Sequence, residues 1–276
     1  MLSTRSADTT GKVAEVERHE SRLAQARDWY LKSVDALGSD AWGKDTLCAG
    51  WTAQHIVAHV ATGDQLFRTR VLDAAGRDRG GEDLPADFAD RQRRFQDALG
   101  WDPARLKAHA HQEAQQMVDV LIDVIEKKPE TMITVPFGTV PLPVARALRL
   151  NEYIIHGHDL GPAIGQSPET PPWFIDRALD ETVTLLMRLH QRSPHKGKAA
   201  SFHIHRTDGE GEWTIKAQSG EAIKEPGHGK ADVAMRGTGE GLYWVLMGRG
   251  RPEEHGVEVH GDRALAGAFK EWFPGP

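Results

Sequence analysis

The 276-residue sequence contains only one cysteine, Cys48, so it can form neither an internal disulfide nor a four-thiolate metal site. It also lacks an apolar run approaching the roughly 20 residues that a membrane-spanning helix needs. The first residues, Met1 to Lys12, are polar and contain no apolar signal core. These absences predict a protein that stays in the cytosol and does not enter a membrane.

Charge of one sign is not concentrated anywhere in the chain. There are 34 Lys and Arg against 40 Asp and Glu, a formal net charge of -6 at pH 7. No stretch combines basic with aromatic residues in the way that neutralises a phosphate backbone, so nucleic acid is not an expected partner. The mixture of 39% hydrophobic and 27% charged residues is typical of a globular chain.

Apolar residues recur at spacings of three and four along much of the first two thirds of the chain, which predicts amphipathic helices. Thr52 and Asp102 suit the N-cap positions of two of these helices, and Pro103 suits a first turn. The expected elements are helices over 13–37, 53–76, 103–127, 144–160 and 172–191, a loop with partial helix over 77–100 and a proline-rich extended connection over 129–143.

The composition changes after the fifth expected helix. Residues 193–198 read as a linker, and alternating patterns on both sides of Asp208-Gly209 predict a hairpin. The sequence therefore predicts a helical bundle over 13–192 and a smaller α+β domain over 199–276. The elements expected in the second domain are strands over 201–205, 212–217, 232–235 and 256–260 and helices over 239–247 and 262–272.

Within the expected fourth helix, Glu152 and His156 lie four positions apart, which places both side chains on one helical face. A carboxylate and an imidazole one turn apart can bind one divalent ion inside a helical bundle. The same spacing also occurs in surface pairs and in capping interactions. The spacing alone therefore leaves these interpretations open.

His59 in the second expected helix is a possible partner of this pair. It shares a helical stripe with Ile56 and Leu66, so its side chain is expected to point into the bundle. It can be a core histidine bonded to a backbone carbonyl, or it can join Glu152 and His156 as a metal ligand. Two imidazoles and one carboxylate would leave coordination positions open, which favours catalysis.

Three groups of residues carry a family resemblance. The first group is Trp42 and the segment 48–52, which lead to His59. The second is Glu152-x-x-x-His156, followed by Gly157 and the pair 159–160. The third consists of the segments 231–237, 246–249 and 257–262. This pattern resembles the mycothiol-dependent maleylpyruvate isomerase family over nearly the whole chain. The resemblance implies a DinB-like four-helix bundle followed by a sterol-carrier-like α+β domain.

The resemblance also implies a chemistry. By motif match, His59, Glu152 and His156 would bind a divalent metal, commonly zinc, and mycothiol would be the thiol cosubstrate. A metal with free positions binds a thiol as its thiolate, which would add to a small electrophile, either to isomerise maleylpyruvate or to form a conjugate. The alternatives are a non-catalytic metal-containing small-molecule binding protein and a DinB-like metalloenzyme that uses no thiol.

Other residues have expected supporting roles. Arg249 is the expected catalytic residue, because its guanidinium can clamp an anionic substrate; the alternative is a solvated arginine at a helix C-terminus. Arg149 can pair with Glu152. Asp159, three positions after His156, can orient that imidazole or cap the following segment.

The remaining candidates are expected to stay outside the chemistry. His55 is expected at the solvent or behind the ligands, and His158 lies on a different helical face from the predicted ligands. Cys48 has no base near it in the sequence, which favours a small apolar role over a nucleophile. Trp51 and Trp244 are expected to be packing residues.

Overall fold

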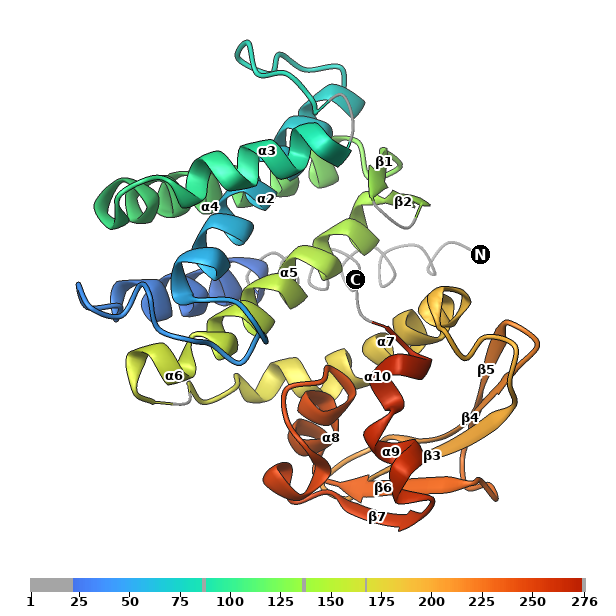
Figure 1. Cartoon of the computed structure of the whole chain (residues 1–276). Helices are drawn as coiled ribbons and strands as arrows, with labels where there is room; N and C mark the ends of the chain where they lie inside the picture. Colours follow the sequence, from blue (N-terminus) through green and yellow to red (C-terminus); the bar gives the residue numbers. More distant parts are fainter. Residues whose placement is uncertain (1–21, 86–87, 136–137, 167, 275–276) are drawn as a thin grey trace, which may run out of the picture. The chain divides into compact units, whose positions relative to one another are not determined.

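The computed structural model describes residues 22–85, 88–135, 138–166 and 168–274 (Figure 1). The chain forms two compact units that divide between Pro168 and Glu169. The first unit is helical and the second contains a sheet, which confirms the expected fold class. The expected linker over 193–198 lies later in the chain than this division. The helix before that linker packs with the sheet of the second unit, so the helix belongs to the second unit.

The helices of the first unit follow the apolar pattern of the sequence. One helix covers 22–35, and the part of its expected range before residue 22 lies outside the described residues. The other helices are α2 (Ala53–Ala74), α3 (Phe88–Leu99), α4 (Pro103–Lys127), α5 (Leu142–Asp159) and α6 (Gly161–Ile164). Asp102 caps α4 as predicted, since its carboxylate accepts a hydrogen bond from the Arg105 N–H at 3.0 Å.

The proline-rich connection between α4 and α5 is extended, as expected, but it also forms a hairpin that was not predicted. Strand β1 (Met132–Val135) pairs antiparallel with β2 (Gly138–Pro141). Only Ile133 and Val135 of β1 are buried. Two strands of four residues with few apolar positions give too weak an alternation to be recognised in the sequence.

The helix over 22–35 packs closely against α5. The rings of Tyr30 and Tyr153 stack with their centroids 5.6 Å apart. One turn further along α5, a Cβ atom at Gly157 would lie only 2.3 Å from Cζ3 of Trp29. This close approach explains why a residue without a side chain follows His156 directly.

The second unit is a five-stranded sheet with helices. The strand order is β5-β4-β3-β6-β7, in which β3 and β6 form the parallel pair. Helix α7 packs against α8 and β5, which places it in this unit. The elements are α7 (Pro172–Leu189), β3 (Ala200–Arg206), β4 (Glu212–Gln218), β5 (Glu221–Pro226), β6 (Val233–Gly237), α8 (Gly239–Leu246), β7 (Glu258–Gly261), α9 (Arg263–Gly267) and α10 (Phe269–Trp272).

Two features of this unit differ from the prediction. The helix expected over 262–272 is interrupted at Ala268 and becomes α9 and α10. Strand β5 was not predicted, because it is an edge strand whose residues are exposed or only partly buried. Its signal lay in the turn before it, where Ser219 and Gly220 have φ angles of 54° and 84°, as the two-residue turns of hairpins require.

Strand alternation gives the sheet two different faces. Phe202 and Ile204 of β3 are fully buried, and the ring of Phe202 lies 5.3 Å from that of Phe269 in α10. The helices α8 to α10 therefore cover this face, as Figure 1 shows. His203 and His205 consequently point to the opposite face of the sheet.

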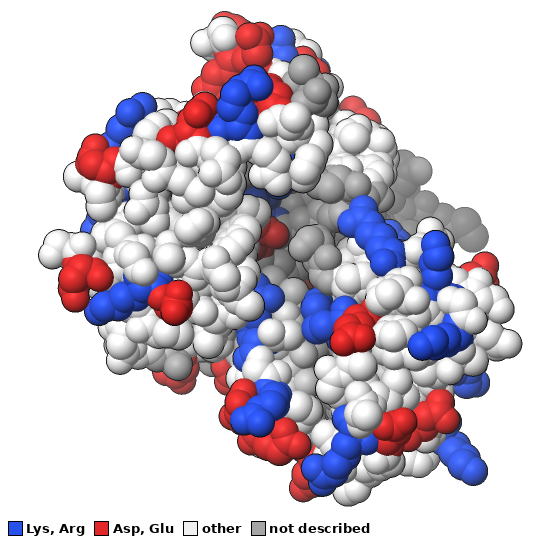
Figure 2. Space-filling model, in the orientation of Figure 1, with Lys and Arg blue, Asp and Glu red and all other residues white. Residues whose placement is uncertain are grey.

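Charged side chains of both signs are mingled on the face of the molecule that Figure 2 shows. Around the charged segment after α2, for example, Arg77 pairs with Asp123 and Arg94 with Asp90. Within the described ranges, the helices are either too short or too polar to cross a membrane.

The contact between Gly157 and Trp29 gives a stability prediction. We expect Gly157→Ala to lower the free energy of unfolding by about 1–3 kcal/mol, because the added methyl group overpacks the contact between α5 and the helix over 22–35. Urea unfolding followed by tryptophan fluorescence measures the change. The matched control is Gly43→Ala, where a Cβ meets no atom within 4 Å. Equal stability of both variants would contradict the packing argument.

Candidate metal centre

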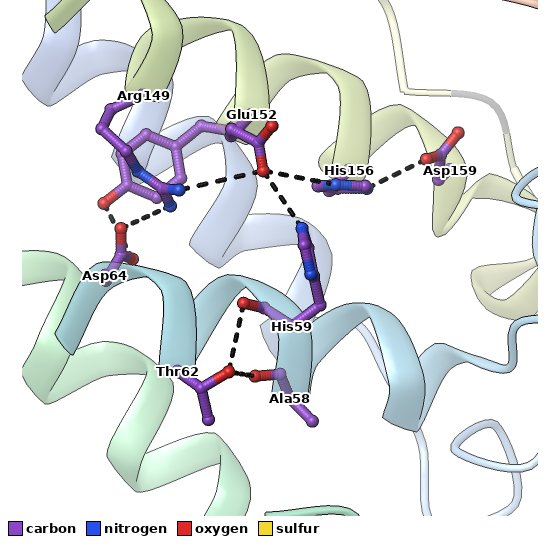
Figure 3. A network of polar contacts seen from close by, with 9 residues as sticks. Ala58, His59, Thr62, Asp64, Arg149, Glu152, His156 and Asp159 are labelled. Carbon is purple, nitrogen blue, oxygen red and sulfur yellow. Dashed lines mark hydrogen bonds and ion pairs between the residues drawn. The ribbon is translucent and has the colours of Figure 1, made fainter. Parts of the chain in front are cut away.

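Helices α2 and α5 bring His59, Glu152 and His156 together (Figure 3). The Oε2 atom of Glu152 lies 3.2 Å from Nε2 of His59 and 3.6 Å from Nε2 of His156. One potential ligand atom from each residue lies within 4.8 Å of the other two. The structure thus assembles the three residues selected from the sequence, and their binding of a metal stays a prediction.

The charge of Glu152 dominates this cluster. Burial alone would raise the pKa of Glu152, but the neighbouring imidazoles of His156 and His59 hold it well below its usual range. Burial lowers the pKa of His59, which favours a neutral imidazole. Burial acts in the same direction on His156, but Asp159 and Glu152 outweigh it and raise the pKa of His156 to about 9.

Asp159 orients the ring of His156, which confirms one of the two roles expected for it. Its fully buried carboxylate places Oδ2 3.0 Å from Nδ1 of His156. Because a carboxylate only accepts hydrogen bonds, Nδ1 carries a proton, and Nε2 is directed toward Glu152. The Asp159 carbonyl also accepts a hydrogen bond from the Leu47 N–H at 3.1 Å, which ties the loop before α2 to the end of α5.

Arg149 lies between two carboxylates. Its Nη1 atom is 3.8 Å from Oε2 of Glu152, which confirms the expected pairing. Its Nη2 atom is 2.5 Å from Oδ1 of Asp64, and the Tyr153 hydroxyl donates to the other oxygen of Asp64 at 3.0 Å. Burial raises the pKa of Asp64 to about 6, against the attraction of Arg149.

Asp64 was not predicted as part of the site. A signal was present, because this carboxylate interrupts the apolar stripe of α2 between Val60 and Phe67 and is fully buried. A charged residue on a buried stripe requires a partner of opposite charge. Arg149 is that partner, so the network around Glu152 extends to a second buried carboxylate.

Two aromatic rings flank the cluster. The ring of Trp51 lies 5.1 Å from that of His59 and 6.4 Å from that of His156. Phe95 of α3, which was not predicted, lies 5.8 Å from Trp51. Trp51 therefore packs against the candidate ligands, and Trp244 is buried, as expected of a packing residue.

The other candidates of the first unit lie outside the three-residue cluster. Nδ1 of His55 lies 2.7 Å from the hydroxyl of Thr52 and accepts from the Thr52 N–H at 3.3 Å, so His55 caps α2. His158 is buried on α5. Cys48 is half-buried in the loop before α2, where its N–H donates to the Thr46 hydroxyl.

Arg249 belongs to the second unit and lies three positions after the end of α8. Its Nη1 donates to the Met247 carbonyl at 2.8 Å. Burial, together with the nearby charge of Arg249, lowers the pKa of Lys270 to about 8. Two cationic side chains thus lie close together here, and the anion-binding role of Arg249 stays a prediction.

Comparison with known families decides the identity of the fold. The description "Mycothiol maleylpyruvate isomerase N-terminal domain" matches residues 23–161, and the C-terminal domain of the same family matches residues 169–268. The chain belongs to the mycothiol maleylpyruvate isomerase family. The boundary between the two family domains agrees with the division of the structure between Pro168 and Glu169.

Solved structures agree with this family assignment. A crystal structure of a histidine-to-alanine mutant of the mycothiol-dependent maleylpyruvate isomerase has a TM-score of 0.66 at 17% identity, covering 88% of this chain and 92% of that chain. A structure of the mycothiol-dependent maleylpyruvate isomerase has a TM-score of 0.64 at 17% identity, covering 85% and 90%. No curated protein matches the chain. At this level of identity, the likeness to the solved structures shows a shared fold.

The buried pair of Asp64 and Arg149 gives a second prediction. We expect Asp64→Asn to destabilise the protein by about 3–5 kcal/mol, because it leaves the guanidinium of Arg149 buried without its closest counter-charge. Chemical denaturation at pH 7.5 measures the loss. The control is Asp73→Asn on the same helix, whose carboxylate is 51% exposed and is expected to contribute less than about 1 kcal/mol. Similar losses in both variants would refute the buried-pair argument.

Lys270 gives a prediction about pH. Its folded-state pKa of about 8 lies below the ordinary 10.5, so the unfolded chain binds more protons than the folded chain between these pH values. The stability of the wild type is therefore expected to rise as the pH increases through this window. Lys270→Met should flatten the rise, as thermal unfolding at a series of pH values can test. Parallel profiles of wild type and variant would contradict the shifted pKa.

Proposed function

We propose that this protein is a metal- and mycothiol-dependent enzyme that adds a thiol to a small electrophile. The observation that carries the proposal is the meeting of His59, Glu152 and His156 from two helices around one carboxylate oxygen. Membership in the family supports the enzyme class and the thiol. The reaction would be a cis–trans isomerisation of maleylpyruvate or the transfer of mycothiol to an electrophile.

The residues of the cluster fit a divalent metal such as zinc. Two imidazole nitrogens and one carboxylate are a donor set that open catalytic zinc sites use. Asp159 stands behind His156 in the position of an outer partner that orients a metal-bound imidazole. His59 and Glu152 are 25% and 28% exposed, so the donor set is not closed off by protein atoms.

The residues have distinct roles in this proposal. His59, Glu152 and His156 would hold the ion, which lowers the pKa of a thiol and so supplies a thiolate near neutral pH. Arg149 holds the carboxylate of Glu152 in place from its other side. The rings of Trp51 and Phe95 lie beside the imidazole of His59 and would limit the access of water there. Arg249 would bind a carboxylate of the substrate with its planar guanidinium.

Metal content and activity test the ligand assignment together. We expect the wild-type protein to retain zinc at this site and His59→Ala to lose that ion. The activity of His59→Ala should fall by at least about 100-fold, which is the upper end of the loss caused by removing a residue that orients a metal ligand. Elemental analysis and a maleylpyruvate conversion assay measure the two quantities. His111→Ala is the matched control, because this exposed histidine of α4 pairs with Asp35 outside the cluster. Unchanged metal and activity in His59→Ala would refute the assignment.

The consumption of mycothiol distinguishes the possible reactions. An isomerisation releases the thiol again, so many substrate molecules turn over for each mycothiol added. A transfer consumes one thiol for each conjugate formed. Turnover without mycothiol would favour a thiol-independent metalloenzyme, and tight binding without turnover of any electrophile tested would favour a binding protein. The cytosolic location stays a prediction.

A further inference from the structure

A second cluster of imidazoles around one carboxylate lies in the sheet of the second unit. His205 of β3 pairs with Glu212 of β4 in the strand register, and His203 pairs with Thr214. Oε1 of Glu212 lies 3.1 Å from Nε2 of His203, 2.9 Å from Nδ1 of His205 and 3.1 Å from Nδ1 of His228. These residues come from two neighbouring strands and from the segment that follows β5.

The segment after β5 is fitted closely onto this face of the sheet. A Cβ atom at Gly229 would lie 2.4 Å from Oγ1 of Thr214, so only glycine allows the backbone to approach this far. The Gly229 carbonyl lies 2.9 Å from Nδ1 of His203. His228 directly precedes this glycine, and its Nδ1 lies 3.1 Å from Oε1 of Glu212. The fold therefore brings the backbone of His228 to the face that carries His203 and Glu212, while the His228 side chain stays 84% exposed.

The two nitrogens of His203 face different partners. Nδ1 lies beside the backbone of Gly229, 2.9 Å from its carbonyl oxygen and 3.4 Å from its N–H. When Nδ1 carries the proton, it donates to the carbonyl, and Nε2 directs a lone pair toward a carboxylate oxygen 3.1 Å away. A cation bound by both acceptors would satisfy this arrangement. His203 is only 5% exposed, so the pair lies away from bulk water.

We propose that His203, Glu212 and His228 bind a divalent transition-metal ion such as zinc. One ligand atom from each residue lies within 4.8 Å of the other two. Imidazole and carboxylate donors suit such ions, and the backbone carbonyl behind His203 is the outer partner that metal-bound histidines commonly have. His205 supports the carboxylate of Glu212 from the strand. The ion would tie the segment after β5 to β3, independently of the function proposed for the first unit.

Zinc binding to the full-length protein tests this proposal. We expect isothermal titration of chelator-treated protein with zinc chloride to show two ions for each wild-type chain. His228→Ala should retain one ion, and its affinity for the second ion should fall by more than about 10-fold. This is the smallest loss caused by removing a residue that orients a metal ligand. His228 is 84% exposed, so this substitution is not expected to disturb folding.

Two further variants make the result decisive. His260→Ala removes a 66% exposed histidine of β7 from the same unit and should retain both ions. His59→Ala should lose the ion of the first unit and keep the one bound by His228, so failure of either site is distinguishable from failure of the other. Zinc binding that His228→Ala leaves unchanged, or equal weakening in His228→Ala and His260→Ala, would overturn the proposal.

Discussion

The carboxylate of Glu152 is the charge on which the candidate centre depends. A carboxylate in this position would be costly without partners, because the interior solvates charge poorly. Here His59, His156 and Arg149 approach it from two helices. Since these partners come from both α2 and α5, the relative position of the two helices is coupled to the charge of one side chain. Stability and candidate chemistry therefore share the same interaction.

The groups along α5 alternate in charge, as Figure 3 shows. Asp159, His156, Glu152 and Arg149 follow one another, and Asp64 of α2 ends the series. Each basic group lies between two carboxylates, which explains why His156 and Arg149 both have raised pKa values although burial opposes their charge. When all are ionised, the series holds one more carboxylate than basic groups. This surplus of negative charge suits the binding of a cation at Glu152.

Local patterns in the sequence predicted the features that depend on the spacing of residues within one helix or strand. The helical repeat identified the helices, and the spacing of four between Glu152 and His156 gave their common face. Partners contributed by other elements were not predictable in this way. Phe95 comes from α3 within a charged segment, and Asp64 meets Arg149 only after α2 and α5 pack. Short edge strands such as β5 were missed, because half-exposed strands lack a strong apolar alternation.

The cluster in the sheet shows the same limit more clearly. On a helix, two side chains that share a face are four positions apart, whereas on a strand they are two apart, as His203 and His205 are. The strand register adds Glu212, and a glycine far along the chain adds His228 by letting the backbone approach. No single window of sequence contains these relations. Helical spacing therefore indicates the first cluster and not the second, although both place imidazoles around one carboxylate oxygen.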